Sequence, residues 1–291
     1  MAADADATAP PLAVISWPFE HGLPDRGMGA GAALLAGDPD LHALLEGAGW
    51  APTLQRVAGG DAGAPELART FDVLRQLARD VRSAVTRGAF PLVLAGGCLS
   101  AAATVAGAGD TDLGVVWLDA HADLDDPEDN ESGFLDVMAL SVLTGRCWRA
   151  QRERIDGHVP VPEERVALLG VRDLAAYQRA RMEASGVHVV PGAIEPVARD
   201  RALAALPART YLHVDLDVLD PSVGRANAYA APCGASLDAV LRIVDRVFDR
   251  GPVVAAALSA YDPAVDRDGA ILDAARAIAG RIAVHAMAQR R

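Results

Sequence analysis

Short apolar runs alternate with longer helical patterns along most of this chain, and this alternation restricts the possible folds more than any other feature. The runs are continuously apolar, as in strands that are buried on both faces of a parallel sheet. They lie at residues 12–15, 92–95, 114–118, 166–169, 187–190, 210–214 and 253–258. The order predicts an α/β fold in which helices connect the strands of a parallel sheet.

The segments between these runs have the spacing of amphipathic helices, with apolar residues at steps of three and four. The clearest patterns cover residues 65–87, 237–248 and 270–287. Gly88 is expected to end the first of them, because glycine favours the backbone conformation that stops a helix. Nearer the N-terminus, we expect a glycine-rich loop at 22–31 and a short helix near 32–35.

Chain length and composition predict a single domain. With 291 residues and 51% hydrophobic content, the chain can bury one sizeable core, and its composition does not shift along its length. Residues 1–11 lack apolar periodicity and a basic start, so we expect a disordered tail there and not a signal peptide. The predicted domain covers residues 12–291.

Charge and residue usage exclude several classes of function. A net charge of −12 would repel a phosphate backbone, so nucleic-acid binding is not expected, and no apolar run approaches the roughly 18 residues of a membrane helix. All 27 basic residues are arginine, which excludes enzymes that depend on a phosphate-loop or Schiff-base lysine. The three unevenly spaced cysteines, Cys98, Cys147 and Cys233, predict free thiols and a cytoplasmic location.

Two clusters of possible metal ligands follow the runs 114–118 and 210–214. They consist of Asp119, His121, Asp123, Asp215 and Asp217. Ligands of parallel sheets bind at the carboxyl ends of the strands, and alternate residues of an extended chain point to the same side. Several carboxylates this close require a cation, and oxygen ligands with one imidazole suit Mn, Mg or Zn. In the alternative interpretation, these aspartates cap helices or line a solvated rim.

The motifs DAHAD at 119–123 and HVDLDVLDP at 213–221 resemble the paired metal motifs of the ureohydrolases, the family of arginases, agmatinases and formimidoylglutamases. Further likeness extends over most of the chain, through residues 27–31, 96–97, 170–173, 232–234 and 262–263. The resemblance implies a three-layer α/β/α fold with a mostly parallel sheet. It also implies a two-manganese centre, a small-molecule substrate whose guanidino or amidino C–N bond is hydrolysed, and a homo-oligomer.

The first metal motif of the family differs in this chain. The family has Gly-Gly-Asp-His-Ser, and its histidine binds the first manganese, whereas residues 96–100 read Gly-Gly-Cys-Leu-Ser. Leu99 therefore stands where a ligand is expected. By resemblance, the first metal keeps three aspartates and the second keeps its full set. These sets are Asp119, Asp123 and Asp215 for the first, and Asp119, His121, Asp215 and Asp217 for the second.

Three positions that contact substrate in the family also differ. Asp136 stands where the family has its acid/base histidine. Ala260 replaces the glutamate that pairs with a guanidinium, and Ala175 replaces an acidic contact to the substrate amino group. These replacements argue against arginine as the substrate.

Two interpretations of the altered site remain open. The chain is interpreted as a divergent metal-dependent hydrolase of a non-peptide C–N bond of the amidine, guanidine or amide type, in which Asp136 delivers a proton. It would use one or two Mn²⁺ ions, or a single Zn²⁺ as in the distantly related histone deacetylases. The alternative is a catalytically inactive binding or scaffold protein with the same fold. The five retained ligands favour the hydrolase, because uncompensated carboxylates have no electrostatic reason to stay together.

Three features each have a functional and a structural interpretation. His213 either substitutes for the missing imidazole or makes a buried hydrogen bond, and Cys98 is either a metal ligand or nucleophile, or a small buried residue. Asp136 is either an acid/base group or a helix cap. The acidic run at 125–131 either attracts a cationic substrate or forms a solvated loop.

Overall fold

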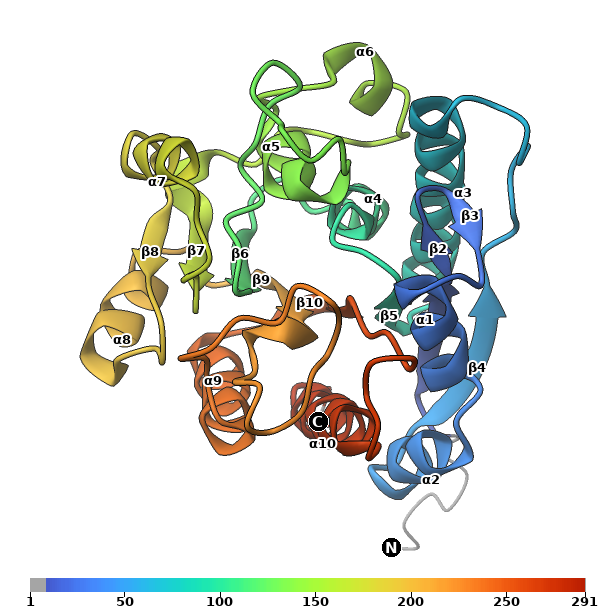
Figure 1. The fold of residues 1–291 in the computed structure, drawn as a ribbon. Helices are drawn as coiled ribbons and strands as arrows, with labels where there is room; N and C mark the ends of the chain where they lie inside the picture. Colours follow the sequence, from blue (N-terminus) through green and yellow to red (C-terminus); the bar gives the residue numbers. More distant parts are fainter. Residues whose placement is uncertain (1–8, 291) are drawn as a thin grey trace, which may run out of the picture.

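The protein, described by a computed structural model over residues 9–290, has one eight-stranded sheet and a small two-stranded ribbon. The strands of the large sheet are β1 (Pro11–Trp17), β4 (Ala51–Arg56), β5 (Phe90–Ala95), β6 (Gly114–Leu118), β7 (Val166–Leu169), β8 (His188–Val190), β9 (Thr210–Asp215) and β10 (Val253–Ser259). Their order is β4-β1-β5-β10-β9-β6-β7-β8, and all neighbours pair in parallel (Figure 1). The ribbon joins β2 (Phe19–Glu20) and β3 (Leu23–Pro24).

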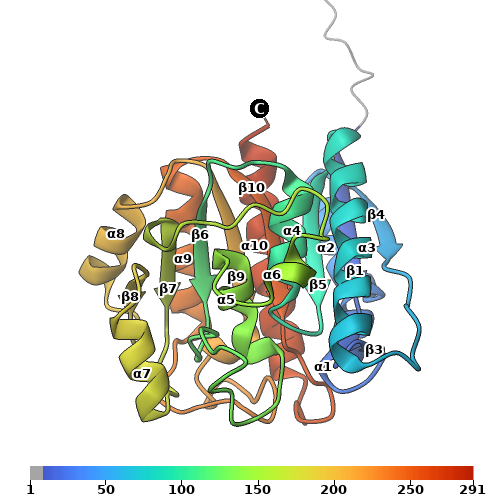
Figure 2. The ribbon, with the colours of Figure 1, turned by 90° about the horizontal axis from the view of Figure 1, so that it is seen from above.

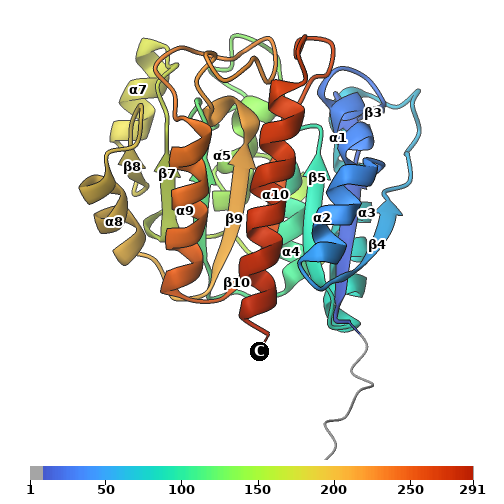
Figure 3. The ribbon, with the colours of Figure 1, turned by 90° about the horizontal axis from the view of Figure 1, so that it is seen from below.

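Helices cover both faces of the sheet. They are α1 (Met28–Ala36), α2 (Pro39–Gly47), α3 (Glu66–Thr86), α4 (Ser100–Ala108), α5 (Ala139–Thr144), α6 (Arg149–Arg152), α7 (Ala176–Glu183), α8 (Pro196–Ala204), α9 (Leu237–Arg250) and α10 (Ala270–Ala288). Figure 2 shows α3, α4 and α5 over one face, and Figure 3 shows α9 and α10 over the other. Three short 3-10 helices, η1 (Asp136–Met138), η2 (Glu163–Arg165) and η3 (Leu216–Val218), lie in the connections. The predicted three-layer α/β/α fold is confirmed.

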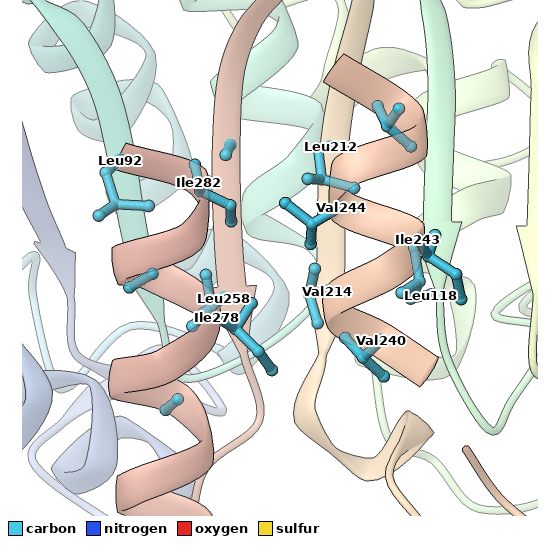
Figure 4. Close-up of a cluster of buried hydrophobic side chains, with 14 of the residues drawn as sticks. Leu92, Leu118, Leu212, Val214, Val240, Ile243, Val244, Leu258, Ile278 and Ile282 are labelled. Carbon is cyan, nitrogen blue, oxygen red and sulfur yellow. The ribbon is translucent and has the colours of Figure 1, made fainter. Parts of the chain in front are cut away.

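Each face of the sheet packs against its own helical layer, which explains why the strands are apolar without interruption. Leu212 and Val214 of β9 face the α9–α10 layer, whereas Tyr211, the residue before Leu212, packs on the α3–α4 side. Figure 4 shows Ile243 and Val244 of α9 directed at this sheet face. Burying both faces of the central strands removes apolar surface from water at roughly 25 cal/mol per Å², the main favourable contribution to this core.

The strands and long helices predicted from the sequence are present, with ends shifted by a few residues at most. β4 was missed because its residues are largely exposed at the sheet edge and form no apolar run. Residues 1–8 of the predicted tail lie outside the described residues, and β1 begins at Pro11. Within residues 9–290, no helix is both long and apolar enough to cross a membrane.

The expected loop at 22–31 is wrong in its second half, because α1 begins at Met28. The glycines there serve close packing. A Cβ at Gly29 would lie 2.7 Å from the carbonyl oxygen of Pro18, and one at Gly31 would overlap the carbonyl oxygen of Tyr261. The glycine-rich pattern therefore reflects a helix that lies tightly against neighbouring backbone.

Substitution of Gly31 by Ala should lower the free energy of unfolding by at least about 1–3 kcal/mol, because the Cβ must displace backbone in a packed region. Gly280, also inside a helix, is the matched control: the nearest atom to its Cβ would be Leu44 Cδ1 at 3.8 Å. Gly280→Ala should be neutral or stabilise by roughly 0.5–1 kcal/mol. Urea unfolding curves measure both, and equal effects would contradict the packing argument.

Candidate functional site

A pocket of about 530 Å³ opens at the carboxyl ends of β5, β10, β9 and β6, the four adjacent strands at the centre of the sheet. All five ligand candidates predicted from the sequence line it, together with Asp136 and Cys98. The side chains that these four strand ends supply are Cys98, Asp119, His121, Asp123, Asp215, Asp217 and Ala260. Binding sites of parallel sheets characteristically lie at this edge.

Sheet register explains why the two clusters meet. Leu118 pairs with Val214 in the parallel ladder of β6 and β9, so the residues that follow, Asp119 and Asp215, lie side by side. The predicted reason for the convergence of residues 119–123 is only partly right, because β6 ends at Leu118 and the chain then turns. Asp123 has a left-handed backbone with φ of 52°, and this turn directs its carboxylate into the pocket.

The first group of ligand atoms belongs to Asp119, His121 and Asp217, whose atoms lie within 4.8 Å of one another. His121 Nδ1 is 3.4 Å from Asp119 Oδ1 and 3.4 Å from Asp217 Oδ2. Neighbouring side chains orient the two carboxylates: Trp117 Nε1 donates to Asp119 Oδ2 at 2.9 Å, and Asn227 Nδ2 donates to Asp217 Oδ2 at 3.1 Å. Asp119 is thus held at Oδ2 and faces His121 with Oδ1, whereas Oδ2 of Asp217 lies near both Asn227 and His121, and its Oδ1 accepts the N–H of Ala120.

A second group shares Asp119 with the first and adds Cys98 and Asp123, again within 4.8 Å of one another. Cys98 Sγ donates to Asp215 Oδ2 at 2.9 Å, so Asp215 also borders this group. Asp123 is only 8% exposed, and its carboxylate has no hydrogen-bond partner among residues 9–290. A carboxylate so little exposed and without a hydrogen bond from the protein is costly as a charge, because burial disfavours its ionised form.

The electrostatics of the pocket reflect this crowding. Burial, reinforced by the neighbouring aspartates, raises the pKa of Asp123 and of Asp215 well above the usual carboxyl value. The pKa of Asp119 is raised by burial and by Asp217. Burial would also raise the pKa of Asp217, but the adjacent His121 outweighs it and lowers that pKa. One imidazole is insufficient positive charge for four buried carboxylates.

The residues present fit one or two divalent cations. Carboxylate oxygens from two strand ends, one imidazole and one thiol are all ligand types for such ions. The unpartnered carboxylate of Asp123 lies in the second group, where a cation would compensate it, and Asp119 belongs to both groups as a shared ligand would. The chemistry of this donor set favours Mn²⁺ or Zn²⁺ over ions that bind oxygen alone.

Leu99 and Asp136 lie side by side, but only Asp136 lines the pocket. The Leu99 side chain packs in the hydrophobic cluster beneath α3 and α4, and its backbone N–H donates to Asp136 Oδ1 at 3.0 Å. A Cβ at Gly97 would overlap Asp136 Oδ2, which accounts for the glycine at that position. Burial raises the pKa of Asp136 to about 6.

His213 lies beneath the pocket and does not line it. Its Nδ1 is 2.9 Å from the hydroxyl of Tyr211, its Nε2 is 3.1 Å from Ser259 Oγ, and its ring stacks on Trp117 with centroids 4.0 Å apart. Burial lowers the pKa of His213 to about 3, so the ring is neutral. This is the geometry of the buried hydrogen-bonding alternative, because both ring nitrogens are engaged.

The outer wall of the pocket is aromatic. Phe134 stacks with Tyr229 at a centroid distance of 5.8 Å and tilts against His21 at 4.9 Å. Ala175 and Ala260 also line the pocket, and neither offers a polar side chain to a substrate. The loop that carries Phe134 is held by local hydrogen bonds of Asn130, which accepts from 132 and 133 and donates to the carbonyl oxygen of Phe134.

The acidic run at 125–131 lies outside the pocket lining. Asp125 accepts hydrogen bonds from Tyr177 and Gln178 of α7, and Asp126 and Asp129 pair with Arg181 of the same helix. Glu128 and Glu131 are exposed. The run therefore fastens the pocket loop to α7 through three of its five carboxylates.

Three residues that support the site were not recognised from the sequence as part of it. Trp117 and Asn227 donate to the carboxylates of Asp119 and Asp217, as described above. Arg172 donates from its guanidinium to the backbone carbonyls of 170, 217, 219, 231 and 232, which joins the end of β9 to the loop that follows. Of these three residues, only Arg172 could have been found from the sequence, since it lies in the motif at 170–173.

Comparison with known proteins gives the same result by sequence and by structure. A family model described as the arginase family matches residues 11–288. An arginase from Bacillus caldovelox is 33% identical over 232 residues, covering 73% of this chain and 77% of its own. The crystal structure of arginase from Bacillus subtilis superposes with a TM-score of 0.81 at 26% identity, covering 94% of this chain and 98% of that chain. A putative agmatinase from Clostridium difficile superposes with a TM-score of 0.72 at 17% identity, covering 96% and 98%.

Replacing Asp123 by Asn should raise the stability of the metal-free protein and lower the stabilisation that metal provides. In metal-free protein the change removes a buried, unpartnered charge, so the free energy of unfolding should rise by about 1–3 kcal/mol. In protein saturated with Mn²⁺ it removes a ligand, so the stabilisation by metal should shrink. Thermal melts with EDTA and with Mn²⁺ measure both effects.

Asp220→Asn provides the control, because Asp220 accepts backbone N–H bonds from Ser222 and Gly234 at the next turn, away from the pocket. It should lower stability equally in both conditions. If Asp123→Asn behaved in the same way, the fit of this cluster to a cation would be wrong.

Proposed function

The chain belongs to the arginase family, and from that premise we propose that it is a metal-dependent hydrolase that cleaves a non-peptide C–N bond in a small molecule other than arginine. The observation that carries the proposal is the convergence of Asp119, His121, Asp123, Asp215 and Asp217 on one pocket with a partnerless buried carboxylate. The family resemblance supports the reaction class, and the donor set supports the cofactor.

Metal binding is assigned to the two groups of ligand atoms described above. By the family resemblance, Asp119, His121, Asp215 and Asp217 would hold one ion, and Asp119, Asp123 and Asp215 would contribute to another; Asp215 lines the same pocket but belongs to neither group of ligand atoms. When bound, such ions supply Lewis acidity and lower the proton affinity of water, which provides a nucleophile at neutral pH. The proposed ion is Mn²⁺, and a single Zn²⁺ is the alternative.

The chain's own residues orient the reaction. Trp117 and Asn227 fix the carboxylates from behind, so these ligands need no rearrangement when substrate binds. Asp136 is proposed to exchange a proton with the leaving group from its carboxyl oxygen Oδ2. Its other oxygen, Oδ1, is held by the N–H of Leu99, and its carboxyl group lies on the pocket wall. The aromatic wall of Phe134 and Tyr229 would exclude water from the planar group being cleaved.

The substrate preference rests on what the pocket wall lacks. A guanidinium is recognised by a carboxylate in paired hydrogen bonds, and Ala260 offers none. Ala175 likewise offers no acceptor to an α-amino group. The curated relatives described above are arginases, so their names do not support this part of the proposal. The aromatic wall favours an amidine, amide or formimino compound with a planar or apolar body.

A scaffold protein is the second candidate, favoured by Leu99, Ala175 and Ala260 at positions where the family has functional side chains. Metal content separates the two candidates. The cytoplasmic location and the homo-oligomer expected from the sequence stay predictions.

Protein purified without chelator should contain at least one equivalent of Mn or Zn by elemental analysis, and Asp217→Ala should lower that content to background. At a metal concentration of about 100 Kd, the parent should gain roughly 2.7 kcal/mol of stability and the variant almost none. Metal-free parent protein that takes up no divalent ion would support the scaffold.

Metal-loaded protein should hydrolyse an amidine, amide or formimino compound with a kcat/KM at least about 100-fold above that for arginine, as expected for one missing charged contact of roughly 3 kcal/mol. Ammonia and urea release measure this across a substrate panel. Phe134→Ala should raise KM for the preferred compound without changing metal content. Preference for arginine would refute the substrate assignment.

A further inference from the structure

Cys98, and not the residue at the family's histidine position, is directed into the second group of ligand atoms. Both residues border the same hydrophobic cluster, but only Cys98 lines the pocket, where its Sγ lies with Asp119 and Asp123 oxygens inside a 4.8 Å span. Ligands of one ion are separated by such distances, since each lies about 2.0–2.3 Å from the metal. The chain therefore brings a sulfur atom to the place that lost an imidazole.

The surroundings of Cys98 suit a ligand better than a nucleophile. The residue is 4% exposed, and its Sγ contacts Asp215 Oδ2 at 2.9 Å and Ser259 Oγ at 3.3 Å. A nucleophilic thiolate requires a nearby base or positive charge and access to substrate, and these carboxylates repel it instead. A cation between them reverses that repulsion, because it attracts the thiolate and the carboxylates alike.

A chain of hydrogen bonds holds the sulfur in place from behind. Ser259 Oγ lies between Cys98 Sγ and His213 Nε2, and His213 Nδ1 is bound in turn by Tyr211. Supporting contacts of this kind orient metal ligands and are as specific as the ligands themselves. The buried His213 thus supports the position of the Cys98 sulfur through Ser259.

We propose that Cys98 binds a divalent metal through Sγ as a thiolate, together with Asp119, Asp123 and Asp215, and that this position prefers Zn²⁺ to Mn²⁺. On binding, a metal–sulfur bond forms and the thiol proton is released to water, so charge balances. Thiolate is a soft ligand that selects Zn²⁺, whereas the group around His121 offers only oxygen and nitrogen. The inference rests on the proposed metal-dependent function. It adds that the metal position at Cys98 has a sulfur ligand and prefers a different ion from the position around His121.

Cobalt titration of metal-free, full-length protein tests the proposal, because thiolate-bound Co²⁺ gives a charge-transfer band in the near ultraviolet. The parent and the Cys147→Ala/Cys233→Ala variant, which removes the other two thiols, should both show the band. Cys98→Ser should lose it and bind Zn²⁺ more than about 100-fold more weakly, since loss of a ligand should exceed loss of a supporting contact.

The outcomes separate the two proposals. Cobalt uptake without the band in the parent would overturn the role of Cys98 and leave the metal-dependent hydrolase standing. No uptake of any divalent ion would overturn both. If Cys98→Ser does not fold, X-ray absorption of zinc-loaded Cys147→Ala/Cys233→Ala decides: sulfur at about 2.3 Å supports the proposal, and oxygen and nitrogen alone refute it.

Discussion

The structure depends on four buried carboxylates that one edge of the sheet forces together. Register places Asp119 beside Asp215, and the strand ends then direct Asp123 and Asp217 into the same pocket. Burial weakens their hydration and strengthens their mutual repulsion, and the imidazole of His121 compensates only part of it. The apolar layers on both faces of the sheet stabilise the fold against this local cost, as strain at functional sites generally requires.

Much of this arrangement was predictable, because continuous apolar runs define buried parallel strands and polar residues directly after them identify the site edge. The sequence did not predict β4, whose exposed residues form no apolar run. It also predicted a loop at the start of α1, because glycine occurs both in loops and in helices that pack closely on other backbone. The site residues Trp117 and Asn227 gave no motif of their own. Their roles come from contacts with Asp119 and Asp217 that only folding creates.

At one position, sequence comparison with the family and the fold draw attention to different neighbours. Leu99 aligns with the histidine, so the sequence indicated a lost ligand there, whereas the fold turns the preceding side chain, Cys98, into the pocket. Alignment compares positions along a chain, but coordination depends on which side chain the backbone directs inward. That direction is set by the tight turn at Gly97 against Asp136.

The two halves of the aromatic wall are attached by different kinds of contact. Tyr229 lies on a segment fixed at both ends, by Asn227 to the carbonyl of Ala260 and by Arg172 to the carbonyls of 231 and 232. Phe134 lies on a loop that Asp126 and Asp129 join to Arg181 of α7, that Asn130 closes locally, and that Asp136 joins to the N–H of Leu99. The rim of the pocket is therefore bounded by two segments that are each held on both sides of their aromatic ring, one largely through backbone carbonyls and the other largely through carboxylates.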